Sequence, residues 1–105
     1  MAVTEKLVRD NVPELDRRRN GTSRFRTAAE GEMGPLLLRK IMEECGELLS
    51  APEEDVPHEA ADLIEAVLAY AQHMGHPPEL VDHVRRLKMS ERGGFGWRQV
   101  WIIPY

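Results

Sequence analysis

The sequence predicts a mainly α-helical protein: an antiparallel helical bundle with short peripheral strands near the N- and C-termini. Three long segments repeat apolar residues at helical spacing and are bounded by proline or glycine. The chain is 42% hydrophobic and 30% charged, a balance typical of globular rather than disordered proteins. With 105 residues, it is expected to form a single domain, residues 1–105.

The first expected element is a short helix near Pro13, because proline suits a first helical position, and Asn20-Gly21 ends it. Residues 23–27 alternate in character and predict a short strand. The aromatic and β-branched residues 97–103 predict another strand, which could pair with the first. Long helices bounded by proline or glycine are predicted at 35–49, 57–74 and 78–91.

Charge and composition exclude several classes of protein. Lys and Arg number 14 against 18 Asp and Glu, so the net charge of −4 argues against binding duplex nucleic acid. The apolar runs are far shorter than the ~20 residues of a membrane span, so no membrane partner is expected. A single cysteine excludes an internal disulfide. With no apolar signal core near Met1, we expect a cytoplasmic protein.

The helix expected at 35–49 carries carboxylates where a core-facing helix should be apolar. At about 100° per residue, Glu44 lies only about 20° from Leu37 on the helical wheel, inside the apolar stripe. Glu47, three residues later, lies at the edge of that stripe. A single pair of this kind usually belongs to a solvated helix face.

The next helix repeats the arrangement. Glu59 shares a stripe with Leu63, and Asp62 flanks it at the offset that Glu47 has from Glu44. The short connection predicts antiparallel neighbours, which would bring the carboxylates together. Clustered anions persist when they are protonated, paired with cations or bound to a metal. Oxygen ligands suit Mg²⁺, with Mn²⁺ as an alternative. The alternative to two solvated faces is therefore a metal site formed by Glu44, Glu47, Glu59 and Asp62.

Basic residues also have two interpretations. Lys88 falls inside the apolar stripe of its helix and either snorkels to solvent or reaches phosphate beside the acidic cluster. The glycine pair in Arg92-Gly93-Gly94-Phe95 could bring backbone N–H groups to an anion. Arginines at positions 17, 18, 19, 24 and 26 form either a solvated face or a surface for phosphate or a partner.

Four blocks span nearly the whole chain: Lys6-Leu7-Val8-Arg9-Asp10-Asn11-Val12-Pro13-Glu14, Lys40-Ile41-Met42-Glu43-Glu44-Cys45-Gly46-Glu47-Leu48, Glu59-Ala60-Ala61-Asp62-Leu63-Ile64-Glu65 and Lys88-Met89-Ser90-Glu91-Arg92-Gly93-Gly94-Phe95. Together they resemble the MazG-like all-α nucleoside triphosphate pyrophosphohydrolases, and most closely the small phosphoribosyl-ATP pyrophosphohydrolase-like branch.

The resemblance implies Mg²⁺-dependent cleavage of a nucleoside triphosphate to monophosphate and pyrophosphate, in a homodimer or higher homo-oligomer. By motif match, the metal ligands would be Glu44, Glu47, Glu59 and Asp62. Glu43 would help orient or deprotonate water, and the catalytic set would comprise Glu43, Glu44, Glu47 and Lys88. The phosphate-binding residues would be Lys40, Lys88 and Arg92.

Two other functions remain open at this level. One is hydrolysis of phosphoribosyl-ATP in histidine synthesis, and the other is a helical regulatory or interaction module that keeps an acidic metal site without turnover. The short segment between the two acidic motifs also suggests that part of a nucleotide pocket comes from another subunit.

Overall fold

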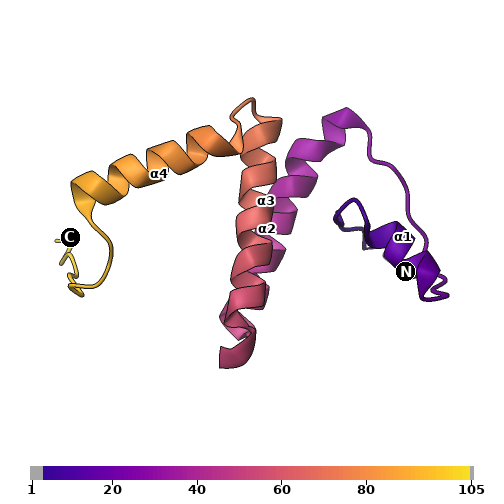
Figure 1. Ribbon diagram of the computed structural model, residues 1–105, viewed down its shortest axis with the longest axis horizontal. Coiled ribbons are helices and arrows are strands. Elements are labelled where there is room, and N and C mark those ends of the chain that lie inside the picture. Colours follow the sequence, from indigo (N-terminus) through magenta and orange to yellow (C-terminus); the bar gives the residue numbers. More distant parts are fainter. Residues whose placement is uncertain (1–3, 105) are drawn as a thin grey trace.

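The computed structural model describes residues 4–104 of the chain, which is mainly helical (Figure 1). The helices are α1 (Val12–Arg18), α2 (Met33–Ser50), α3 (Val56–His73) and α4 (Pro78–Arg92), and the 3₁₀ turns η1 (Glu30–Glu32) and η2 (Glu53–Asp55) precede α2 and α3. The three long helices end within two residues of their predicted limits, so the predicted helical class is confirmed.

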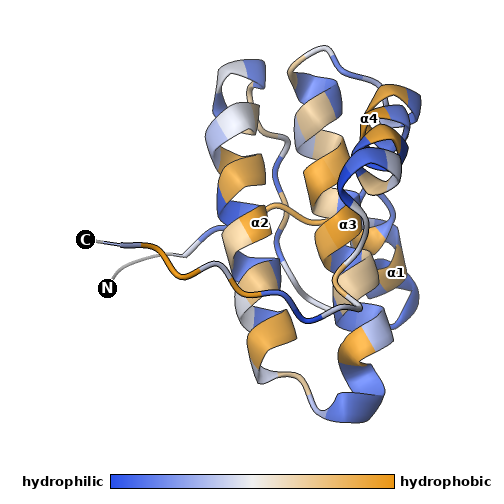
Figure 2. Ribbon diagram, turned by 90° about the vertical axis from the view of Figure 1, so that its left-hand side faces the viewer, coloured by the Kyte–Doolittle hydropathy of each residue, from blue (hydrophilic) through white to orange (hydrophobic). Residues whose placement is uncertain are grey.

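Helices α2 and α3 lie side by side and antiparallel, as Figures 1 and 2 both show. Ala51 is extended at the end of α2, as expected for a residue before proline, and η2 closes the short connection. Leu37 of α2 and Ala66 of α3 are buried, and they mark the small core of the described chain. The predicted antiparallel pair therefore positions the two acidic motifs.

Helix α4 leaves this pair rather than packing along it (Figure 1). Gly75 adopts a φ of 92°, which glycine reaches without steric cost, and Pro77-Pro78 then starts the next helix in a new direction. The residues after α4 turn back beneath the far end of this helix, at a distance from α2 and α3 (Figure 1).

The predicted strands are wrong. No strand occurs among residues 4–104: residues 23–27 are extended without a ladder, and residues 97–103 form an irregular tail. A β-branched or aromatic segment becomes a strand only when another backbone offers hydrogen bonds, and the two segments lie at opposite ends of the molecule (Figure 1). The apolar and β-branched composition of these two segments is therefore not evidence that they pair as strands.

The described chain is far from spherical. Its radius of gyration is 17.6 Å, against about 13 Å for a compact domain of this length. Several large apolar side chains are exposed, and Trp97 and Trp101 retain 89% and 81% of their accessible surface. Within residues 4–104, no helix combines the length and apolar character that crossing a membrane requires.

Candidate metal centre

Three carboxylates converge where α2 faces α3. Glu44 comes from the middle of α2, and Glu59 and Asp62 come from the first two turns of α3. One oxygen from each lies within 4.8 Å of the others. Glu44 retains only 7% of its accessible surface, which confirms the prediction that it faces the apolar stripe. The antiparallel pairing therefore brings together three of the four predicted metal-binding residues.

The fourth, Glu47, is exposed on α2 and lies outside this trio. It still acts on the site through its charge. Desolvation raises the pKa of the Glu59 carboxyl above its usual value. Neighbouring carboxylates raise this pKa further, in the order Glu47, Asp62, Glu44 and Asp55. The charged form of Glu59 is therefore disfavoured until a cation approaches.

Lys40 lies one turn before the two glutamates on α2. Its Nζ is 3.3 Å from Oε1 of Glu44 and 3.5 Å from Oε1 of Glu43. The three side chains are mostly buried, so Lys40 neutralises this end of the acidic cluster at short range. Its ammonium is thus engaged by protein carboxylates in this structure.

Two cations from the N-terminal segment also reach the cluster. The Nζ of Lys6 lies 3.2 Å from Oε1 of Glu43 on α2, and Nη2 of Arg9 lies 2.8 Å from Oδ1 of Asp62 on α3. Neither residue was among those predicted to form the site. Both belong to the first of the four sequence blocks that resemble the MazG-like family. Helical periodicity does not link them to their partners, because Lys6 and Glu43 are 37 positions apart and Arg9 and Asp62 are 53 positions apart.

Lys88 and Arg92 are not brought to the carboxylates within one chain. Both are exposed on α4, and neither side chain forms a hydrogen bond or an ion pair with another residue in the 4–104 range. Because α4 extends away from α2 and α3, a role for them at this cluster needs a second copy of the chain (Figure 1).

Comparison with models of known families, with curated proteins and with solved structures gives no match. Any function proposed for the chain therefore rests on its own residues and geometry. These comprise a partly desolvated carboxylate trio, a fourth carboxylate close by, and three cations at its edges.

Proposed function

We propose that this protein is a cytoplasmic, Mg²⁺-dependent nucleoside triphosphate pyrophosphohydrolase that releases nucleoside monophosphate and pyrophosphate, with non-standard nucleotides as substrates. The observation that carries the proposal is the convergence of Glu44, Glu59 and Asp62 within 4.8 Å between two helices. The resemblance of the four sequence blocks to MazG-like enzymes supports the choice of reaction.

The carboxylate trio suits a hard divalent cation. The three carboxylate oxygens lie within 4.8 Å of one another, and side-chain adjustment would bring them closer around the cation. Desolvation, and after it the neighbouring carboxylates, raise the pKa of Glu59, so a bound cation would be favoured there. A bound Mg²⁺ would supply a Lewis acid that polarises phosphate oxygens and acidifies water. Mn²⁺ fits the same donors.

The remaining residues have distinct proposed roles around these ligands. Glu47 would complete the coordination from the exposed side of α2. Lys6 and Lys40 both hold Oε1 of Glu43, and this fixed carboxylate would orient or deprotonate the attacking water. Arg9 would move from Asp62 to a phosphate once Asp62 is occupied as a ligand.

We propose further that the active form is a homodimer or a higher homo-oligomer that completes a helical bundle. Three exposed aromatic residues after α4 (Phe95, Trp97 and Trp101) offer about 400–670 Å² of surface, half or more of the ~800 Å² that each partner buries in a standard interface. A second copy would also let Lys88 and Arg92 of one chain serve the metal centre of the other, on the phosphate leaving group.

Isotope labelling tests the reaction. In H₂¹⁸O with Mg²⁺, we expect pyrophosphate and a nucleoside monophosphate that carries the label, because water attacks the α-phosphorus. Stepwise release of orthophosphate through a diphosphate would contradict the proposal. Turnover of phosphoribosyl-ATP alone would identify the histidine-synthesis reaction, and Mg²⁺ binding without turnover of any nucleotide would identify the regulatory module.

A further inference from the structure

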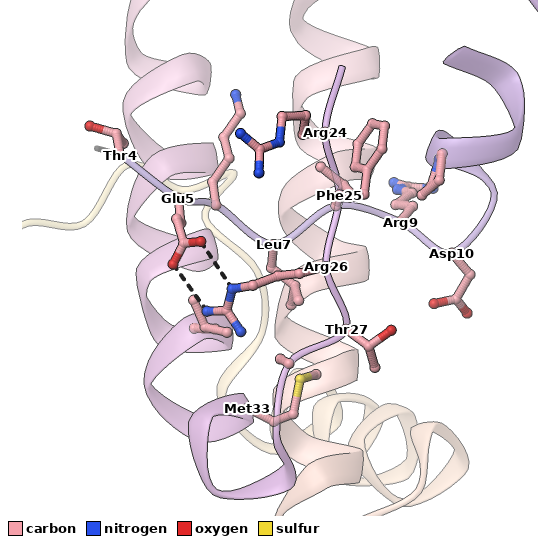
Figure 3. A pocket seen from close by; sticks show the side chains of 15 residues that line it. Thr4, Glu5, Leu7, Arg9, Asp10, Arg24, Phe25, Arg26, Thr27 and Met33 are labelled. Atoms are coloured by element: carbon pink, nitrogen blue, oxygen red, sulfur yellow. Dashed lines mark hydrogen bonds and ion pairs between the residues drawn. The ribbon is translucent and has the colours of Figure 1, made fainter. Parts of the chain in front are cut away.

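A pocket of about 780 Å³ lies between two extended segments and the start of α2. Residues 4–10 form one wall, residues 24–28 form the other, and Met33 and Leu36 contribute from α2 (Figure 3). The volume falls in the range of small-molecule sites. An ion pair joins the walls: the Arg26 guanidinium binds both oxygens of Glu5 at 2.9 and 3.0 Å (Figure 3).

The pocket concentrates positive charge in a chain whose net charge is −4. Its lining includes four cations (Lys6, Arg9, Arg24 and Arg26) and two carboxylates (Glu5 and Asp10). Arg26 is satisfied by Glu5 and by Glu32. Arg24 forms no hydrogen bond or ion pair with any residue from 4 to 104. The pocket therefore contains a guanidinium that no protein carboxylate neutralises within the described chain.

The same pocket borders the metal centre. Lys6 and Arg9 line it, and these side chains bind Glu43 and Asp62 at the edge of the carboxylate cluster. An extended anion bound at the metal centre and passing between Lys6 and Arg9 would enter the pocket. Phe25, next to Arg24 on the wall formed by 24–28, presents an exposed ring there (Figure 3).

We infer that this pocket binds the nucleoside monophosphate part of a nucleotide, with Arg24 on the phosphate and Phe25 against the base. A guanidinium gives a charge-assisted, often bidentate contact with phosphate, and an aromatic ring stacks on any base without requiring its identity. The inference rests on the proposed function for the position of the phosphates: the α-phosphate would lie where the pocket borders the metal centre, and the remaining phosphates would lie at that centre.

Equilibrium binding of uncleavable probes tests the inference. The probes are AMP, GMP, CMP and UMP, with adenosine as a probe that lacks phosphate, followed by NMR titration of the full chain. Arg24→Ala should lower the affinity for the monophosphates by about tenfold or more and leave the affinity for adenosine unchanged. Phe25→Ala should lower the affinity for adenosine and for the monophosphates by about fivefold or more, and Phe25→Tyr should restore these affinities.

Arg19→Ala is the matched control, because Arg19 is an exposed arginine at the end of α1 outside the pocket. It should bind every probe like the wild type. Retained adenosine binding shows that the Arg24→Ala pocket is folded. Any of three results would overturn the inference. Arg24→Ala could bind the monophosphates as tightly as Arg19→Ala does, Phe25→Ala could bind every probe like the wild type, or the wild type could bind no monophosphate.

Failure of this pocket and failure of the proposed function give different results. If the wild type cleaves no triphosphate but Arg24 and Phe25 show the expected pattern, the pocket stands and the hydrolysis proposal falls. If the wild type releases pyrophosphate while both variants bind like the control, the hydrolysis proposal stands and the pocket assignment falls.

Discussion

Nη2 of Arg9 lies 2.8 Å from Oδ1 of Asp62, across 53 positions of sequence. The pair attaches the N-terminal segment to α3 at the carboxylate cluster. Both side chains are about half exposed, so the pair contributes at most about 1 kcal/mol to stability. Its consequence is chemical: Arg9 neutralises a proposed metal ligand, and under the proposed function it would also contact a phosphate of the substrate.

Arg9→Ala should therefore have opposite effects on two ligands. Without nucleotide, Mg²⁺ affinity should rise by up to about fivefold, because the competing cation on Asp62 is removed. Nucleotide affinity in Mg²⁺ should fall, because a phosphate contact is lost. Calorimetric titration measures both. Arg86→Ala removes a comparably exposed pair with Asp82 on α4 and should change neither affinity. Weaker Mg²⁺ binding by Arg9→Ala would contradict the competition.

Glu44→Gln tests the most buried carboxylate. Mg²⁺ at one hundred times its dissociation constant should stabilise the wild type by about 2.7 kcal/mol, and the variant should lose most of that increment. Turnover should fall by orders of magnitude. The readout is the change in unfolding midpoint between metal-free and Mg²⁺-loaded samples of each protein. Glu91→Gln, an exposed change on α4, should keep the wild-type increment. Equal increments in all three proteins would refute ligation by Glu44.

The pH dependence of the stability of Glu59→Gln should report the repulsion among the clustered carboxylates. Because the folded protein raises the pKa of Glu59 above 4.5, the native state binds more protons than the unfolded state as the pH rises past 4.5. Stability is therefore lost over that interval, and the loss persists at neutral pH. In EDTA at pH 7, Glu59→Gln should melt at a higher temperature than the wild type.

The difference in melting temperature between Glu59→Gln and the wild type should shrink as the pH falls below 4.5, because Glu59 of the wild type is then protonated in both the folded and the unfolded state. Saturating Mg²⁺ should abolish or reverse it at pH 7, since the cation stabilises the carboxylate of the wild type. Thermal unfolding at several pH values measures these shifts. A difference in melting temperature that does not vary with pH would contradict the electrostatic explanation.

The exposed tail predicts self-association. Light scattering of the wild type at micromolar concentration should give at least twice the 12.0 kDa mass of one chain. Replacing both Trp97 and Trp101 with serine should weaken association by at least about thirtyfold, because large aromatic residues dominate interface energies. Gln99→Ser, a polar change in the same segment, is the control. A wild type that scatters as a 12.0 kDa monomer would refute this assembly.

Local patterns determined the helices and half of the candidate site. Proline and glycine placed the ends of α2, α3 and α4 to within two residues, since they restrict the backbone without help from distant residues. The periodicity of α2 placed Glu44 among apolar residues, and it is buried. Strand formation at 23–27 and 97–103 was mispredicted, because a strand depends on a distant partner that these segments lack among residues 4–104.

The sequence by itself determined where the helices begin and end, and which of their faces carry carboxylates, because both follow from contacts within a few residues. Only the tertiary structure decided which charges meet. It brought Glu59 and Asp62 to Glu44, added Arg9 from the N-terminal segment, and left Lys88 on a helix that leads elsewhere. Ion pairs between residues 37 or 53 positions apart depend on how the whole chain packs, and local periodicity does not predict that packing.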